Sequence, residues 1–158
     1  MPPQYIKTIL ERLSSRRISP REAFVALREL PFENLGFAHV DHHRTLRNGF
    51  PEVIFCDGKS LEQSFRIFQR LAQRETGVLA TRANLDLFKF VQKKFPRAVF
   101  HSLARIISLP PKRKKRVLRK KKVLLISAGT SDLPVVEEAR ATLEFLGIPL
   151  RVIQDVGV

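Results

Sequence analysis

The residues best suited to chemistry form the run AGTSD at 128–132, which lies between an apolar strand-like segment and a helix-like segment. Open α/β sheets bind ligands at such loops, because the free N–H groups and partial positive charge of the helix start favour an anion. Gly129 would let a ligand approach the backbone closely, and Thr130 and Ser131 would add hydroxyl groups. The pattern therefore predicts an anion site.

Asp132 has the wrong sign for a phosphate, but its carboxylate could bind a ribose hydroxyl or hold a metal ion. In a plainer interpretation, Ser131 or Asp132 only caps the helix, and the residues alone leave both interpretations open. Asp155, at the end of the next expected strand, could orient a ribose, bind a divalent ion or stabilise a turn. The sequence contains neither GxxxxGK[ST] nor GxGxxG, which excludes a P-loop and an ordinary dinucleotide fingerprint.

Two strands and one helix must position this loop. We expect a strand at 123–127, a helix at about 132–146 that stops at Gly147, and a strand at 150–156, which form a parallel strand–helix–strand unit. Both strands are apolar on both faces, but one helix covers only one face. The missing cover could come from the N-terminal segment, from other chains or from residues absent here. We favour the last source and expect residues 123–158 to begin a longer, truncated α/β domain.

Residues 1–109 have the pattern of a small α+β domain. Two capping boxes, Ser19 with Glu22 and Ser60 with Gln63, predict helix starts, and Asn84 predicts a third. We place the inward face of the helix after Ser60 at Leu61, Phe65, Phe68 and Leu71. The expected helices are 4–15, 20–30, 64–73 and 85–94, and the expected strands are 36–41, 52–55, 77–82, 98–102 and 104–108.

A basic connector, PPKRKKRVLRKKK at 110–122, follows this domain. It holds nine Lys and Arg residues and no acid, so that the net charge of +14 becomes 14 − 9 = +5 for the rest of the chain. We interpret it as a solvated linker. Nucleic-acid binding or a nuclear localisation signal is an alternative, but the run lacks the aromatic residues that stack on bases.

Other candidate sites are weaker. The single cysteine, Cys56, is expected to be a buried thiol at a strand end rather than a nucleophile. His42 and His43 would point to opposite faces of a strand, so we expect no metal site there. No apolar run is long enough to cross a bilayer, and the N-terminus lacks a secretory signal, which together with the single cysteine favours a cytoplasmic location and no membrane partner.

Two motifs resemble the LarB family of pyridinium-3,5-biscarboxylic acid mononucleotide synthases, which take part in nickel-pincer cofactor biosynthesis. AGTSDLPVVEEA and the terminal DVGV are similar to its C-terminal domain, which itself resembles aminoimidazole ribonucleotide (AIR) carboxylase, the PurE protein. The Thr81-Arg82 pair also fits. The N-terminal motif D-x-x-R-x-x-R-x-G-x-P-E-V followed by G-K corresponds to Asp41, Arg44, Arg47, Gly49, Pro51, Glu52, Val53, Gly58 and Lys59.

The resemblance implies an α/β fold in which the small α+β domain precedes a parallel, doubly wound, flavodoxin-like sheet. It implies carboxylation of C5 of the pyridine ring of nicotinic acid adenine dinucleotide with CO2 or bicarbonate, followed by phosphoanhydride hydrolysis that releases AMP. The dinucleotide is the expected partner, and Gly129, Thr130, Ser131, Asp132 and Asp155 its expected binding residues. No tightly bound cofactor is implied, although Mg2+ remains open.

The family's nucleophilic cysteine would lie beyond Val158, so we expect this chain to be inactive alone and the intact form to be a homo-oligomer. Arg44 and Arg47 could clamp a phosphate, but we favour ion pairs with Asp41 and Glu52 that hold the small domain together; Lys59 has no assigned chemistry. The alternatives are AIR carboxylase and a non-catalytic remnant.

Overall fold

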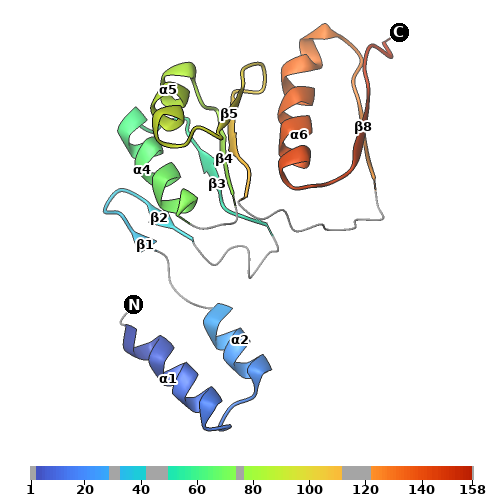
Figure 1. Ribbon diagram of the computed structural model, residues 1–158. Helices are drawn as coiled ribbons and strands as arrows, with labels where there is room; N and C mark the ends of the chain where they lie inside the picture. The colour runs from blue at the N-terminus through green and yellow to red at the C-terminus, as the bar shows by residue number, and fades with distance from the viewer. Residues whose placement is uncertain (1–2, 29–32, 42–49, 74–76, 112–121, 158) are drawn as a thin grey trace. The chain divides into compact units, whose positions relative to one another are not determined.

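The computed structural model describes residues 3–28, 33–41, 50–73, 77–111 and 122–157 (Figure 1), and the structural statements below concern these residues. The chain divides into two compact units, Met1–Phe50 and Pro51–Val158. This division differs from the boundary expected at the basic connector, which stays a prediction. No helix in the described ranges is long and apolar enough to cross a membrane.

The first unit contains two helices and a short hairpin. Its elements are α1 (Pro3–Ser14), α2 (Pro20–Arg28), β1 (Glu33–Asn34) and β2 (His39–Val40), and the two strands pair antiparallel. The Ser19 hydroxyl accepts a hydrogen bond from the Glu22 amide at 3.2 Å, and the Glu22 carboxylate accepts one from the Ser19 amide at 2.7 Å. The capping box predicted at this helix start is confirmed.

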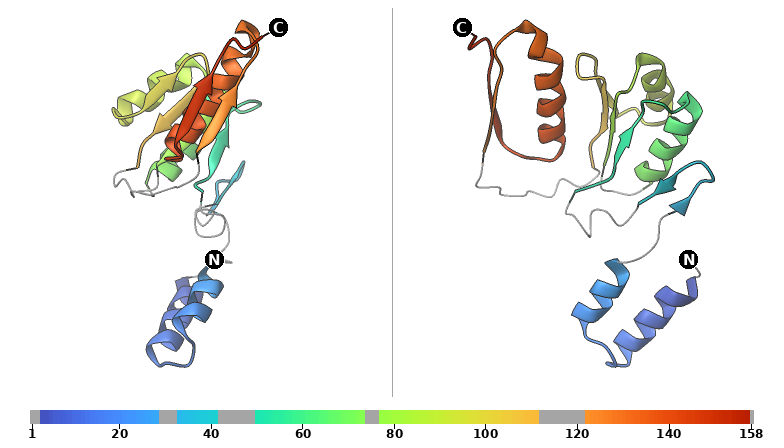
Figure 2. Two further views of the ribbon diagram at one scale, coloured as in Figure 1. Left: turned by 90° about the vertical axis from the view of Figure 1, so that its right-hand side faces the viewer. Right: turned by 180° about the vertical axis from the view of Figure 1, so that it is seen from behind.

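A four-stranded sheet forms the centre of the second unit. Its strands are β3 (Val53–Phe55), β4 (Val78–Thr81), β5 (Val99–His101) and β6 (Ile106–Leu109), in the order β3-β4-β6-β5. Strands β3 and β4 are parallel, and the other two pairs are antiparallel. Helices α4 (Leu61–Ala72) and α5 (Leu85–Lys94) cover one face (Figure 2).

Local caps set where these two helices begin. The Ser60 hydroxyl accepts from the Gln63 amide at 3.1 Å, and the Gln63 side chain accepts from the Ser60 amide at 2.9 Å. The Asn84 side chain accepts from the Leu87 amide at 2.9 Å. All three bonds satisfy N–H groups that have no partner within the helix, so the predicted helix starts are confirmed.

The inward face of α4 was predicted only in part. Phe68 and Leu71 are buried as expected, together with Ser64 and Ile67. Leu61 and Phe65 are half-buried instead. The ring of Phe65 contacts the ring of Phe90 on α5 at a centroid distance of 6.4 Å, so this flank of α4 packs on a helix rather than on the sheet.

The last part of the chain is a parallel strand–helix–strand unit, as predicted. It consists of β7 (Val123–Ile126), the 3-10 turn η1 (Thr130–Asp132), α6 (Leu133–Phe145) and β8 (Leu150–Ile153). Gly147 follows α6 with a φ of +65°, a left-handed conformation that terminates helices and that glycine adopts without strain. The α/β class predicted from the sequence is confirmed.

Helix α6 packs against both sheets of the second unit. One side contacts β7 and β8, and on another side Ala141 and Phe145 join a cluster with Leu79, Ala104 and Ile106 of the larger sheet. This contact buries a second side of α6 but does not cover the outer face of the β7–β8 pair, so the source of that missing cover stays a prediction.

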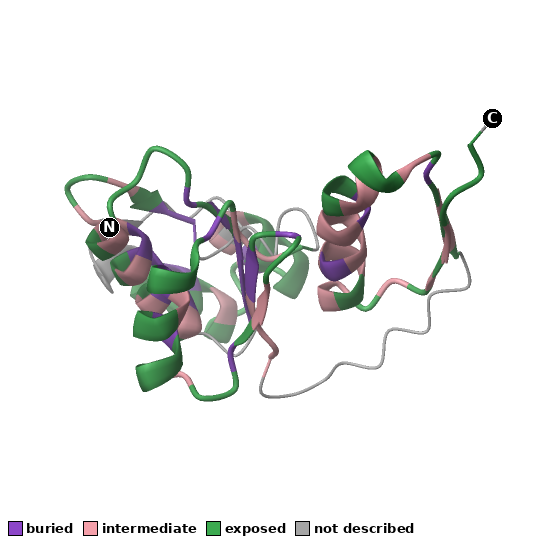
Figure 3. Ribbon diagram, turned by 90° about the horizontal axis from the view of Figure 1, so that it is seen from above, coloured by how far each residue is buried: buried purple, intermediate pink, exposed green. Residues whose placement is uncertain are grey.

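The outer face of the β7–β8 pair has no such cover within the described residues. Leu124 is 52 % exposed and Ile126 59 % exposed. In Figure 3 the larger sheet is mostly buried, whereas β7 and β8 are intermediate or exposed. Strand β4 is covered on both faces, because Val78, Leu79 and Ala80 are all buried. For β7 and β8, the strands to which the expectation of two-sided cover applied, the described residues cover only the α6 side.

Candidate functional site

The candidate site is the loop that joins β7 to α6. Because β7 and β8 are adjacent and parallel, their carboxyl ends meet at the same edge. Ser127 N–H donates to the Ile153 carbonyl at 3.0 Å, and Val156 N–H donates to the Ser127 carbonyl at 3.3 Å. The structure therefore brings Asp155, which is exposed, beside the predicted binding loop.

The chain after β8 passes very close to the start of the loop. A Cβ atom at Gly157 would lie 2.8 Å from the Ala128 carbonyl oxygen, which is shorter than van der Waals contact allows. Gly129, in contrast, has an extended backbone (φ −143°) and open space around its Cβ position. Close packing at Gly157 thus fixes one side of the loop and leaves the side at Gly129 accessible.

Asp132 points back into the loop. One of its carboxylate oxygens accepts hydrogen bonds from the backbone N–H of Ala128 at 3.1 Å and of Gly129 at 3.2 Å. These are two of the amides that the sequence suggested for an anion. Both precede the helix, and the Asp132 side chain makes no capping hydrogen bond to α6, so in this structure it shapes the loop. The exposed hydroxyls of Thr130 and Ser131 form no hydrogen bond within the described residues and remain the groups best placed to meet a ligand.

Ser127 is a residue that the sequence analysis passed over. It is only 6 % exposed, and its hydroxyl has no hydrogen-bond partner among the described residues. Strand alternation places it on the α6 side of β7 with Val123 and Leu125, beneath the start of the helix. An unsatisfied buried hydroxyl is costly. A serine directly after an apolar strand was the signal in the sequence.

Three charged residues of α6 pair with one another within the helix. Arg140 donates to Glu137, with one contact at 2.9 Å, and to Glu144 at 3.1 Å. The hydrogen bond from Arg140 lowers the pKa of Glu137 below its ordinary value, and the same bond raises the pKa of Arg140. The guanidinium of Arg140 is therefore committed to α6 rather than to the loop.

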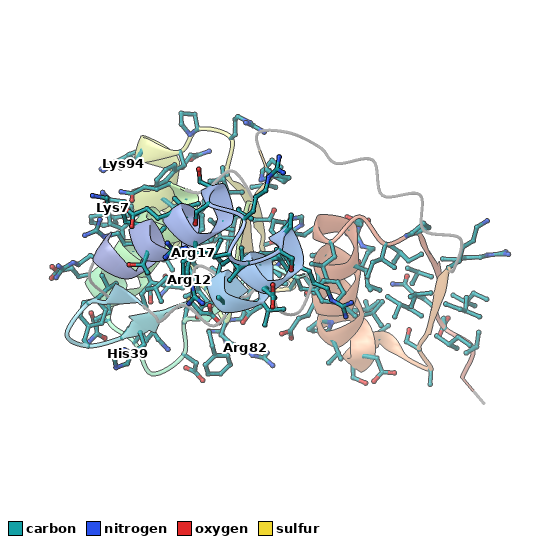
Figure 4. All side chains as sticks on the ribbon, turned by 90° about the horizontal axis from the view of Figure 1, so that it is seen from below. Lys7, Arg12, Arg17, His39, Arg82 and Lys94 are labelled. Carbon is teal, nitrogen blue, oxygen red and sulfur yellow. The ribbon has the colours of Figure 1, made fainter. Side chains whose placement is uncertain are left out.

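A second feature lies at the carboxyl end of β4. Arg82 has a φ of +55° and Arg105, in the turn between β5 and β6, a φ of +52°, both in the left-handed region that disfavours residues with a Cβ. The Ala83 amide donates to the Arg105 carbonyl at 2.8 Å, which joins the two segments. The guanidinium of Arg82 (Figure 4) reaches across to Glu138 of α6, with Nη1 and Oε2 separated by 3.3 Å.

Comparison with known proteins identifies the domain. The family described as the LarB/PurE-like N-terminal domain matches residues 32–112, about half of the chain. The chain belongs to this family. It is also 30 % identical over 129 residues to an uncharacterized protein of Methanocaldococcus jannaschii, a match that covers 75 % of this chain and 48 % of that protein. The chain thus spans about half the length of this relative.

The family match contains the N-terminal motif and the β3–β6 sheet, and it ends before the β7–α6–β8 unit. The resemblance of the N-terminal motif to the LarB family is therefore confirmed. The role of Gly129, Thr130, Ser131, Asp132 and Asp155 in binding a nucleotide stays a prediction.

The LarB-type motif residues have the following places. Asp41 belongs to the first unit, is 6 % exposed and takes part in a polar or electrostatic interaction, as does Glu52 of the second unit. The Lys59 ammonium donates a hydrogen bond to the carbonyl of Phe55, the last residue of β3, at 2.7 Å. Arg44 and Arg47 lie outside the described residues, as does the His42-His43 pair.

Cys56 of the LarB-type domain is a structural thiol. It follows β3 directly, is 8 % exposed and donates its N–H to the Thr81 carbonyl at 3.0 Å. Burial raises the pKa of the Cys56 thiol, and the Ser64 hydroxyl and Lys59 oppose this only in part. A raised pKa disfavours the thiolate, and the predicted buried position at a strand end is confirmed. Within the described residues no cluster of three or more His, Cys, Asp or Glu could hold a metal ion.

Proposed function

We propose that this LarB/PurE-like chain binds nicotinic acid adenine dinucleotide at the loop 128–132 and forms part of a carboxylase. The proposed reaction adds a carboxyl group from CO2 or bicarbonate to C5 of the pyridine ring and hydrolyses the phosphoanhydride, which releases AMP. The observation that carries the proposal is the loop at the carboxyl edge of parallel β7 and β8, in a chain of this family.

The chemistry sets what the remaining groups must supply. A pyridinium ring is electron-poor and does not attack CO2, but addition of a thiolate makes a neighbouring carbon nucleophilic. Loss of the ring proton and of the thiolate then restores aromaticity. Because Cys56 is buried with a raised pKa, the chain's single cysteine does not suit this role. We therefore assign substrate binding, not nucleophilic attack, to the described residues.

The loop offers distinct groups to distinct parts of the dinucleotide. The exposed hydroxyls of Thr130 and Ser131 would donate to a phosphate, and open space at Gly129 would admit it close to the backbone. Asp155 is exposed beside the loop and would accept from a ribose hydroxyl or bind Mg2+. Asp132 would keep the loop in shape through its bonds to Ala128 and Gly129.

The main rival is AIR carboxylase, whose loop is similar. The N-terminal domain matched at 32–112 supports the pyridine substrate, because the purine enzyme is little more than the α/β domain. Most of the basic connector falls outside the described residues, so nucleic-acid binding through it stays an alternative. Self-association of the intact enzyme is part of the same proposal.

Binding by calorimetry tests the substrate assignment. We expect the 158-residue chain to bind nicotinic acid adenine dinucleotide more tightly than aminoimidazole ribonucleotide. A Thr130→Val, Ser131→Ala variant should weaken binding at least about tenfold, because two donors to charged oxygens are lost. Thr142→Val is the matched control, since the Thr142 hydroxyl donates to the Glu138 carbonyl within α6 at 2.7 Å. Two results would contradict the proposal. One is tighter binding of aminoimidazole ribonucleotide, and the other is a Thr130→Val, Ser131→Ala variant that binds the dinucleotide as tightly as the Thr142→Val control.

A further inference from the structure

The proposed binding loop lacks a cation of its own. Residues 123–139, which include β7, the loop and the start of α6, contain Asp132, Glu137 and Glu138 but no Lys or Arg. The segment after β8 adds Asp155 and no base. The helix start contributes only a partial positive charge, and Asp132 already occupies two loop amides. A pyrophosphate bound here therefore needs a positive charge from another element.

Arg82 is the described cation that reaches α6 from outside the strand–helix–strand unit. It extends from the end of β4 and pairs with Glu138 at 3.3 Å. Glu138, Ala141 and Phe145 follow one another at helical spacing, and the last two pack on the larger sheet. Ser131 lies in the turn η1 directly before α6, seven residues before Glu138 along the chain. Arg82 thus contacts α6 within about two helical turns of the loop that holds the binding hydroxyls.

The distance is short enough for the side chain to move from Glu138 to the loop. Glu138 lies five residues into α6 from Leu133, which corresponds to ~8 Å along the helix axis at 1.5 Å per residue. The side chain of Arg82 is 45 % exposed and that of Glu138 27 % exposed, so water reaches the pair and can replace one partner. An exposed ion pair of this kind is weak and exchanges readily.

The backbone of Arg82 is held in place although its conformation is unfavourable. Its φ of +55° is uncommon for a residue with a Cβ, and such positions concentrate at functional sites. Hydrogen bonds fix both neighbours, because the Thr81 carbonyl accepts from the Cys56 amide at 3.0 Å and the Ala83 amide donates to Arg105 at 2.8 Å. A clamped backbone with a partly exposed side chain suits a residue that changes its anionic partner.

We propose that Arg82 is the cation that the N-terminal sheet supplies to the phosphates of the dinucleotide at the α6 loop, and that Glu138 holds it while the site is empty. The inference rests on the proposed function, since it assigns a specificity residue to that site. Arg82 would select substrates whose phosphoanhydride lies near Thr130 and Ser131. Arg97 serves as the matched control, because this exposed arginine donates to the Pro111 carbonyl at 3.3 Å and has no ion pair with α6 in the described structure. Arg105 is unsuitable, since its guanidinium donates to the Arg82 carbonyl at 3.5 Å.

The test is calorimetric titration of the 158-residue chain with nicotinic acid adenine dinucleotide, in the presence of a chelator so that Mg2+ cannot supply the charge. We expect Arg82→Met to weaken binding at least about tenfold and to reduce its salt dependence, since one charge-assisted contact is lost. Arg82→Lys should recover part of the affinity, and Arg97→Met should bind like the unaltered chain. Circular dichroism checks that each variant is folded.

Glu138→Gln provides a second arm that does not remove the cation. It should strengthen binding several-fold, because Arg82 no longer has to leave a carboxylate, and this gain should vanish when Arg82→Met is also present. A gain of equal size in both backgrounds would show a general charge effect and overturn the inference. Equal affinity of Arg82→Met and the unaltered chain would also overturn it while leaving the proposed function intact. No binding by the unaltered chain would overturn both.

Discussion

The carboxylate of Asp132 accepts a hydrogen bond from the backbone N–H of Gly129 at 3.2 Å, and the same oxygen accepts one from Ala128 at 3.1 Å. The loop therefore holds an internal anion where an external one was expected from its sequence. A phosphate that binds here must use the side-chain hydroxyls and amides that Asp132 leaves accessible, or displace the carboxylate. In either case the shape of the loop depends on Asp132.

We predict that Asp132→Ala lowers the free energy of unfolding by about 1 kcal/mol, because two loop amides lose their acceptor at a helix start. Asp132→Asn should lose less, since its amide oxygen can still accept from Ala128 and Gly129. Urea unfolding at neutral pH measures both. Equal stability of all three proteins would mean that water replaces the carboxylate at no cost.

The contact between α6 and the larger sheet can be tested by overpacking. Ala141 is 2 % exposed and packs in the cluster with Leu79 and Ile106. We expect Ala141→Leu to destabilise the chain by about 1–3 kcal/mol, because the added methyl groups have no space. Val135→Leu is the control, since Val135 is 69 % exposed and its change should stay within about 0.5 kcal/mol. If both variants unfold at the same denaturant concentration, α6 does not pack on this sheet in solution.

Short-range patterns explain which parts of the fold could be predicted. A serine or asparagine followed three residues later by its partner determined the starts of α2, α4 and α5, since each cap involves neighbours along the chain. The parallel β7–α6–β8 unit was predictable for the same reason, because its apolar strands, its helix and Gly147 are consecutive.

Long-range contacts explain what could not be predicted. No sequence pattern indicates that Ala141 packs on Leu79, since the two residues are distant in the chain and both are simply apolar. The ion pair of Arg82 with Glu138 could not be predicted for the same reason, because these two residues are also distant in the chain. In the loop, the residue types were compatible with both a cap and an anion site, and only the direction of the Asp132 side chain decided what this residue does.

Cys56 offers a test of burial at the end of β3. Because burial raises the pKa of its thiol, we expect it to react with a thiol reagent at least about tenfold more slowly than an exposed cysteine at mildly alkaline pH. The matched control is the double variant Cys56→Ala, Ser102→Cys, which moves the chain's single thiol to an exposed turn. In denaturant both proteins should react at the same rate. Equally fast reaction of the two folded proteins would contradict a buried Cys56.

The ion pair on α6 gives a pH dependence of known sign. The hydrogen bond from Arg140 lowers the pKa of Glu137 in the folded chain, so the ionised pair stabilises the fold at neutral pH. This contribution is lost as the pH falls through the folded-state pKa, which lies below that of the unfolded chain.

We therefore expect Glu137→Gln to be less stable than the unaltered chain at neutral pH and equally stable in acid. Arg140 is 37 % exposed, so solvent screening limits the difference to about 0.3–0.5 kcal/mol. Urea unfolding between about pH 7 and about pH 3 measures it, provided that both proteins remain folded at the acid end. A constant difference across this range would mean that Glu137 acts through packing rather than through its charge, because only an ionisable group makes the difference depend on pH.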